Sequence, residues 1–480
     1  MATTDTFAHI NEKIGMIAII PEVTKGSPNW SFKAKGTHAT TTIQVNSSTG
    51  TGDHDTRLAG SATGLLDYGY VYVVSASNVT VGSLLQITAY VTAGSVHTFT
   101  VETADGAFAD DDTFYVFGIL PFTEAAITPE QEYHERKLIA KTLDPASGRR
   151  GLGKATVSAK LELGGLTTSS VDGSPATADR WSMLLAGIGT RRAGNGEDAV
   201  TGTLSTTQST VTLASEFNVG DWVTMPSTNA EATKITAVDI STTPDIITFA
   251  PALTAAQVNT DLIIAPEQFN PADSDHQSFT FLKFTDDRRQ MVAGCVFNYK
   301  ISGTYGEPVM MEIEGQGNWD SATAASINDF TADAFTAYKA EQSSKSGIVW
   351  KAVTTVKFST TTLCINSFEF DLGAEIVETR DTCAGVRMDI RGRNSKLSVT
   401  YRDQDDATID TWVSAATVAD IIITIGSTAG AMFGIGGQAQ LTNTPDGENK
   451  EETRYWNSEF TFVDDQTDDA NNYSAAFMRW

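Results

Sequence analysis

A short pattern occurs twice in this chain, and each time it joins a β-strand to a helix. Residues 397–401 alternate apolar and polar side chains, and residues 407–412 then read Ala-Thr-Ile-Asp-Thr-Trp. Upstream, residues 155–163 alternate in the same way, and residues 176–181 read Ala-Thr-Ala-Asp-Arg-Trp. Period-two alternation is typical of strands with one packed face and one wet face. We therefore predict two copies of one β-rich unit. The predicted anchors of the repeated helix are Asp179, Trp181, Asp410 and Trp412.

The charge balance limits the class of function. The chain has 480 residues, with 59 acidic and 33 basic side chains and a formal charge of −26. A general nucleic-acid binder would need a basic face, so this composition argues against one. The chain has three cysteines, an odd number, and its first residues show neither the basic region nor the apolar region of a secretory signal peptide. We therefore expect free thiols in a protein made in a reducing cytoplasm. No run approaches the roughly 18 apolar residues of a membrane span, so we expect no membrane partner.

The predicted fold is mainly β, with two tandem β-sandwich or barrel units, each with a flanking helix, and two small β-barrel modules inserted in loops. The insertions resemble each other, because Val81-Gly82-Ser83 and Val219-Gly220-Asp221 each precede an apolar strand. Surface loops accept such insertions at little entropic cost. The predicted ranges are 1–36, 119–199 and 266–320 for the first unit, 345–480 for the second, 37–118 and 200–265 for the inserted modules, and 321–344 for a linker with a short helix.

Motifs that carry chemistry are weak. Residues 148–154 have the spacing of a phosphate-binding loop, but Ala155 stands where magnesium needs Ser or Thr, so we interpret them as a basic turn between strands. The glycines at 434, 436 and 437 are predicted to form a turn or bulge. The six histidines are scattered, and no Gly-x-Ser-x-Gly elbow occurs. We predict no enzyme, no cofactor and no metal site.

The strands, the helix and the long paired hairpins together resemble a known family. The segment from Ser367-Phe-Glu-Phe-Asp-Leu-Gly through Arg391-Gly-Arg393 is similar to the major tail tube proteins of long-tailed bacteriophages. The resemblance covers both predicted units and leaves out both inserted modules. It implies a β-sandwich with a helix and an extended arm, stacked as rings into a hollow tube. It also implies location in the virion tail, assembly in the bacterial cytoplasm, and tape measure, terminator and distal tail proteins as partners.

The resemblance also implies how such a chain would assemble. Many members have one unit per chain and form six-fold rings, so two units per chain predict a trimer with pseudo-six-fold symmetry. DNA would pass through the tube without specific binding, and an acidic bore would repel its phosphates. The side chains expected to line the lumen or join subunits are Glu312, Glu314, Glu369, Asp371, Arg387, Asp389, Arg391 and Glu459.

Two alternatives stay open. One is a β-rich surface or fibre protein that recognises glycans, and the other is a capsid or decoration subunit. The missing signal segment and the unpaired cysteines favour the tail tube over the adhesin. The sequence leaves undecided whether three or six chains form a ring, which residues line the bore, what the insertions do, and whether the extended arm at 122–133 contacts the next ring.

Overall fold

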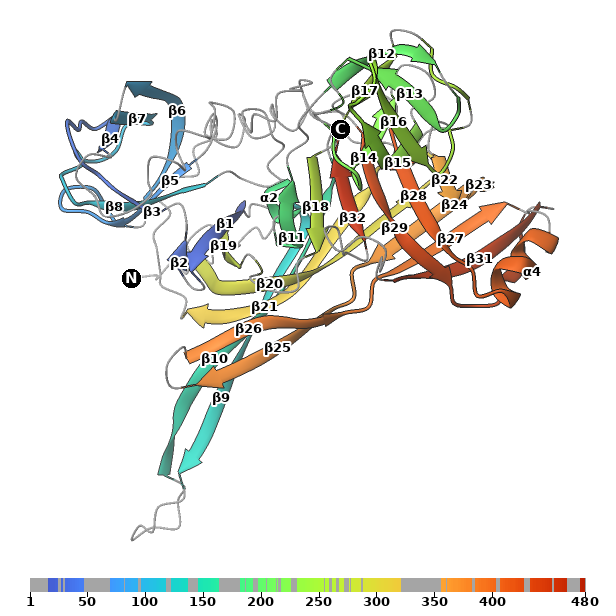
Figure 1. Ribbon diagram of the computed structural model, residues 1–480. Helices are drawn as coiled ribbons and strands as arrows, with labels where there is room; N and C mark the ends of the chain where they lie inside the picture. Colours follow the sequence, from blue (N-terminus) through green and yellow to red (C-terminus); the bar gives the residue numbers. More distant parts are fainter. Residues whose placement is uncertain are drawn as a thin grey trace.

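The prediction of a mainly β fold is confirmed by the computed structural model (Figure 1). The structure describes residues 16–463 and 475–479 with the exception of 25–26, 29–30, 47–69, 82, 94–95, 118–121, 137–145, 164–181, 186, 193–196, 204, 213, 215–216, 226–230, 254, 259–260, 265–266, 272–275, 277, 286–287, 321–354, 360, 382–384, 403–405, 427–431 and 451–452.

One antiparallel sheet runs through the whole molecule, and we call it the long sheet. Its order is β9-β10-β21-β20-β24-β27-β31-β30. The pairing of β20 with β24 joins the N-terminal half of the chain to the C-terminal half. The strands are β9 (Phe122–Arg136), β10 (Ala146–Glu162), β20 (Arg288–Thr304), β21 (Met310–Asp320), β24 (Ile365–Asp371), β27 (Lys396–Arg402), β30 (Asp446–Lys450) and β31 (Thr453–Phe462).

Shorter strands form the remaining layer. In the N-terminal half β1 pairs with β19, and β19 pairs with the first part of β20. In the C-terminal half β22 pairs with β28 and β28 with β29, while β32 bridges β29 and β18. The strands are β1 (Met16–Thr24), β2 (Ser27–Pro28), β11 (Gly189–Arg192), β18 (Glu267–Pro271), β19 (Phe279–Thr285), β22 (Thr355–Phe358), β23 (Thr361–Leu363), β28 (Val418–Ile425), β29 (Phe433–Leu441) and β32 (Ala476–Arg479).

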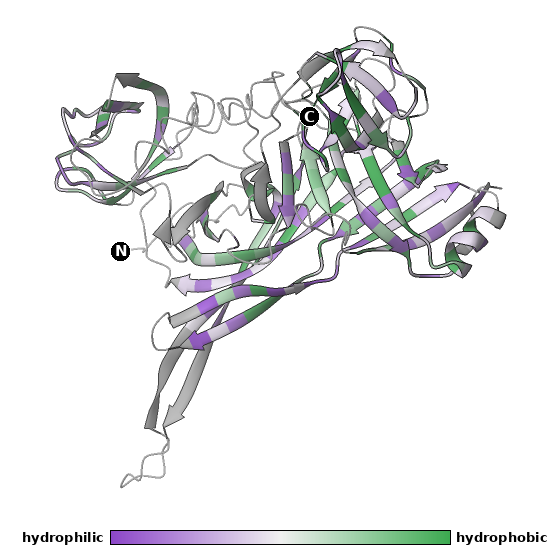
Figure 2. Ribbon diagram, in the orientation of Figure 1, coloured by the Kyte–Doolittle hydropathy of each residue, from purple (hydrophilic) through white to green (hydrophobic). Residues whose placement is uncertain are grey.

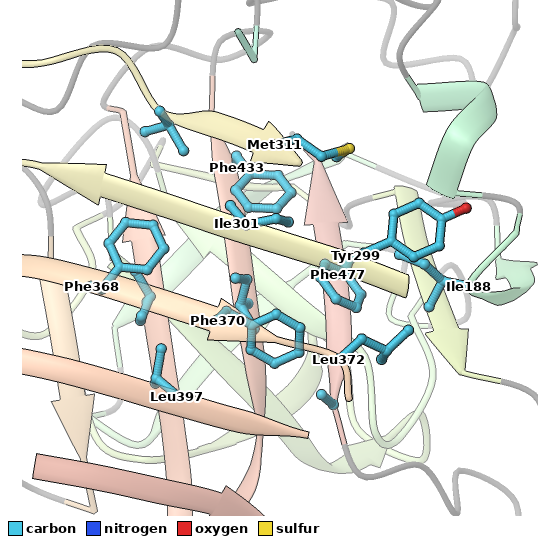
Figure 3. Packing of buried hydrophobic residues seen from close by; sticks show 14 of the residues in the cluster. Ile188, Tyr299, Ile301, Met311, Phe368, Phe370, Leu372, Leu397, Phe433 and Phe477 are labelled. Carbon is cyan, nitrogen blue, oxygen red and sulfur yellow. The ribbon is translucent and has the colours of Figure 1, made fainter. Parts of the chain in front are cut away.

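A single apolar core lies between these layers and draws residues from both halves (Figure 3). Phe370 is central to it, with ring centroids 5.1 Å from Phe477 and 5.5 Å from Phe462. Tyr299 and Ile301 of β20 belong to the same cluster. Because Phe477 lies on β32, the strand that bridges the halves also closes the core that they share.

Tyr299 ties the core to the short helix α2 (Ser182–Leu185). Its hydroxyl donates a hydrogen bond of 2.6 Å to the carbonyl oxygen of Leu184, and the side chain is fully buried. Burial disfavours the phenolate, so the pKa of Tyr299 is raised above its ordinary value. The Tyr299 ring therefore stays neutral and keeps donating this bond.

The predicted helix anchors have different outcomes. Asp179 and Trp181, like the predicted linker 321–344, lie outside the described residues. The second helix, α4 (Asp406–Ser414), buries Trp412 against Phe358, with ring centroids 4.9 Å apart. Asp410 is exposed on α4. Trp412 thus packs α4 onto the core, whereas Asp410 faces solvent.

Residues 197–264 form a closed barrel of order β12-β13-β16-β15-β14-β17. A six-stranded sheet within residues 31–117 has the order β3-β8-β5-β6-β7-β4. This is the same cyclic order as in the barrel when β3 to β8 are matched in chain order with β12 to β17. Lys35 N donates to Gln44 O over 2.7 Å between β3 and β4, where the barrel pairs β12 with β13. The strands are β3 (Ser31–Lys33), β4 (Thr42–Asn46), β5 (Tyr70–Ser75), β6 (Leu84–Ala93), β7 (Val96–Val101), β8 (Thr113–Phe117), β12 (Glu197–Thr203), β13 (Gln208–Val211), β14 (Trp222–Met225), β15 (Glu231–Asp239), β16 (Asp245–Ala250) and β17 (Leu262–Ile264).

Two local expectations differ from the structure. Strand β3, assigned to the first unit by the boundary at residue 36, pairs with β8 of the six-stranded sheet instead. Residues 148–154 are not a turn, because they lie within β10 and pair with β9. In this second case the long pairing of β9 with β10 overrides the local sequence signals. The extended segment expected at 122–133 lies in β9, which pairs with β10 as one side of a long hairpin.

The barrel packs against the C-terminal half, although it is inserted in the N-terminal half. Trp222 of β14 lies in one buried cluster with Ile422 of β28 and Met478 of β32. Gly436 makes room for it, since a Cβ there would lie 3.0 Å from Trp222 Cε2 and Cζ2. The predicted turn or bulge at 434–437 is therefore wrong: these glycines lie in β29 and allow the indole to approach the sheet.

This packing can be tested at Trp222. We expect Trp222→Ala to lower the free energy of unfolding by about 3–5 kcal/mol, because a buried indole is removed and leaves a cavity. Trp222→Phe should cost less than half of that, since the buried indole Nε1 has no hydrogen-bond partner in the described part of the chain. Chemical denaturation measures both. Equal losses for the two variants would contradict an interface that depends on apolar packing.

Candidate assembly surface

One face of the long sheet lies on the core and the opposite face is polar. On β24, Phe368 and Phe370 are buried while Glu369 between them is exposed. On β21, Met311 and Ile313 are buried while Glu312 and Glu314 are exposed. Directly paired residues share a face, so the registers carry this polar face across the whole sheet. The predicted candidates that it brings together are Glu312, Glu314, Glu369, Asp371 and Glu459.

A row of alternating charges crosses six strands of this face. The paired residues, in order, are Glu124, Lys160, Glu312, Lys300, Asp371 and Lys396. Lys300 Nζ lies 3.8 Å from Asp371 Oδ2 across the junction of the two halves. Opposite charges in cross-strand pairs stabilise a sheet by a few tenths to about 1 kcal/mol each. The row therefore favours this register of the strands over slipped ones.

Asp371 also fixes the end of β24. Its Oδ1 accepts hydrogen bonds from Asn298 Nδ2 and Gly373 N, each 2.8 Å long. Gly373 has a φ of +61°, which a glycine adopts without strain. The chain can therefore turn sharply after β24 into the next strand, and the side chain of Asn298 on β20 holds that turn in place.

The strands that follow this turn form a separate hairpin of β25 (Ala374–Asp381) and β26 (Gly385–Arg393). Met388 and Ile390 pack with Val296 of β20, so the hairpin covers one end of the polar face. Lys154 Nζ of β10 lies 3.9 Å from Glu378 Oε2 of β25. Figure 2 shows hydrophilic and hydrophobic residues alternating along β26.

Three predicted candidates lie on this hairpin and not on the long sheet. Arg387 and Arg391 are exposed and Asp389 is half-buried, and all three alternate with Met388 and Ile390 along β26. They therefore face away from the apolar contact with Val296. Period-two alternation shows that these residues share a face, but it does not distinguish a separate hairpin from the sheet beside it.

Carboxylates outnumber cations on the polar face of the long sheet. Sequence reasoning identified five of these eight acids and missed the lysines that separate them, because it had no information on which strands are neighbours. The described charged residues of this face are Glu124, Glu130, Glu162, Glu312, Glu314, Glu369, Asp371 and Glu459 against Lys154, Lys160, Lys300, Lys396 and Arg402.

The long sheet has two open edges. Among the described residues, β9 pairs only with β10, and β30 pairs only with β31. An unpaired strand edge presents a row of backbone N–H and C=O groups that can pair with another chain. The two ends of the long sheet are therefore the places where this molecule can extend its hydrogen bonding.

No protein-family model matches this chain, and no curated protein sequence matches it either. The described residues contain no cluster of three or more histidine, cysteine, aspartate or glutamate side chains that could hold a metal ion. None of the helices in the described ranges is long and apolar enough to cross a membrane. The polar face and its open edges are the features from which a function can be argued.

The charge row can be tested at Lys300. We expect Lys300→Glu to lower the free energy of unfolding by about 1–2 kcal/mol, because it would place three carboxylates side by side in the row. Lys300→Gln should cost less than about 1 kcal/mol, as for other solvent-exposed ion pairs. Thermal or urea unfolding at low and high salt measures both. A loss for Lys300→Glu that does not shrink as salt rises would contradict an electrostatic origin.

Proposed function

We propose that this chain is a structural virion protein that polymerises into the hollow tail tube of a long-tailed bacteriophage. In this proposal the chains join edge to edge into rings, the rings stack, and DNA passes through the bore on its way to the host cell. The proposal combines the sequence resemblance with the open edges and the acidic polar face of the long sheet.

The observation that carries the proposal is that the two halves of the chain have the same pattern of strand pairing. Each of five strand pairs in the N-terminal half has a counterpart in the C-terminal half, in chain order. They are β1–β19 with β22–β28, β9–β10 with β24–β27, β10–β21 with β27–β31, β19–β20 with β28–β29, and β20–β21 with β29–β31. The second part of β20 corresponds to β30, which also pairs with β31. This supports the hypothesis of two copies of one unit.

The correspondence predicts which edges meet. Within the chain, β20 of the first unit pairs with β24 of the second. The counterparts of these strands are β30 and β9, and these are the two open edges. We therefore infer that β30 of one chain pairs with β9 of the next. A head-to-tail contact of this kind closes into a ring when the rotation per chain allows it.

The size of the ring follows from the resemblance, because many tail tube proteins form rings of six units. If all unit junctions are alike, three chains of two units each would fill these six places in a trimer with pseudo-six-fold symmetry. The mass of isolated rings, measured by native mass spectrometry, should then equal three chains. A ring of six chains would contradict this count while leaving the edge-to-edge contact intact.

The polar face suits the wall of a DNA channel. Its carboxylates outnumber its cations, and like charge repels the phosphate backbone. The alternating lysines stabilise the sheet without making the face basic. A chain of net charge −26 presents few surfaces to which DNA would adhere.

A proline at the open edge tests the assembly. In a hairpin with a two-residue turn the residues that flank the turn are hydrogen-bonded to each other. Lys450 pairs with Thr453, so Lys450 and Glu448 bond to β31, and the N–H of Asn449 faces the open edge. We expect Asn449→Pro to fold as the parent does and to form no tubes, as judged by negative-stain electron microscopy at high concentration.

The matched control is Asn449→Ala, which keeps the N–H and should assemble normally. Circular dichroism and thermal unfolding establish that both variants are folded. Long tubes formed by a folded Asn449→Pro variant would refute pairing through β30.

A further inference from the structure

The hairpin β25–β26 has a counterpart in the N-terminal half. It connects β24 to β27, and the corresponding strands of the first unit are β9 and β10. Between these two the chain forms the outer part of the β9–β10 hairpin, in which Arg150 pairs with Tyr133 and Ala146 with Arg136. We call residues 131–136 and 146–153 the arm. Each unit thus extends a hairpin from the same position in its fold.

The two hairpins differ in what they contact. The hairpin β25–β26 lies on the neighbouring unit, where Met388 and Ile390 pack on Val296 and Glu378 lies near Lys154. The outer part of the arm extends past the other strands (Figure 1), and its base at Gly153 lies beside Trp319 of β21, where a Cβ would be 3.2 Å from the indole ring. The hairpin β25–β26 thus contacts a unit of its own chain, whereas the unit that the arm would contact belongs to the next chain.

Charge complementarity indicates the surface that the arm would meet. In a chain of net charge −26, the arm contains Arg136, Arg149 and Arg150 against Glu132 and Glu135. Strand β30 at the opposite end of the long sheet is acidic in sequence, with Asp446 and Glu448 against Lys450. Opposite charges on two surfaces that must meet speed their encounter and suppress wrong pairings.

We infer that the arm docks on the β30–β31 hairpin of the next copy of this chain, as the β25–β26 hairpin docks on β20 and β21 within the chain. This rests on the edge-to-edge assembly proposed above and assigns the arm to the same interface. The contact would lie within a ring, because the intramolecular hairpin covers the unit beside it in the long sheet. The arm adds side-chain specificity to the backbone pairing of β30 with β9.

Charge reversal tests this contact. In the full-length chain we expect Arg149→Glu combined with Arg150→Glu to slow tube formation at least about tenfold at low salt, with a smaller difference as salt is raised. Asp446→Lys combined with Glu448→Lys reverses the other side and should have the same effect. Light scattering and negative-stain microscopy follow assembly, and circular dichroism establishes folding. Combining all four substitutions should restore assembly, because the charges become complementary again.

A mixing experiment separates this inference from the proposed function. The Asn449→Pro chain keeps an intact arm and β9, and the arm variant keeps an intact β30. In a mixture of the two, β9 and the arm of the Asn449→Pro chain should pair with β30 of the arm variant. This should give a one-to-one complex, measured by sedimentation, before the slower self-assembly of the arm variant forms tubes. If the arm variant assembles at the parental rate while Asn449→Pro does not assemble, the inference about the arm is wrong and the proposed function stands. If the mixture forms no such complex, the pairing of β30 with β9 is wrong, and the proposed edge-to-edge assembly fails with it.

Discussion

The pairing of β20 with β24 is the interaction on which this architecture depends. Five consecutive residue pairs, from Lys300 with Asp371 to Thr304 with Ser367, join the two halves of the chain through their backbones. Without this ladder each half would expose two open strand edges and half of a core. With it, one sheet runs from β9 to β30, and Phe370 packs in a cluster that contains Tyr299 and Ile301 from the other half. The junction therefore creates the shared core as well as the continuous polar face.

Among the described residues, both ends of this continuous sheet are unpaired. Proteins commonly blunt or cover such edges, since open edges promote aggregation. Here the pairing of β20 with β24 indicates what could cover them, because the open strands β30 and β9 are the counterparts of β20 and β24. The charge row from Glu124 on β9 to Lys396 on β27 favours one register for the six strands that it crosses. Controlled polymerisation is a physical use for edges of this kind.

The sequence predicted which side chains lie on the polar face, but it did not predict which strands lie next to each other. Alternation of Phe368 and Phe370 with Glu369 determines which side chains face water, because the period of a strand is two. The same pattern cannot specify that Lys300 lies between Glu312 and Asp371, since partner choice depends on contacts distant in sequence. Gly436 was predicted in a turn because glycine is a turn former, yet it lies in β29, where Trp222 of the barrel requires a residue without a side chain. Tertiary packing decided that position, and local propensity had no information on it.

The place of β32 in the chain has a consequence for the order of folding. This strand follows every other described strand in sequence, yet it lies between β18 and β29 and places Phe477 in the shared core. During translation, β18 and β29 are made long before their common partner leaves the ribosome. The nascent chain can form its local hairpins at once, but the two halves reach their final packing only after β32 is released. The core that the two halves share therefore stays incomplete until this last described strand is available.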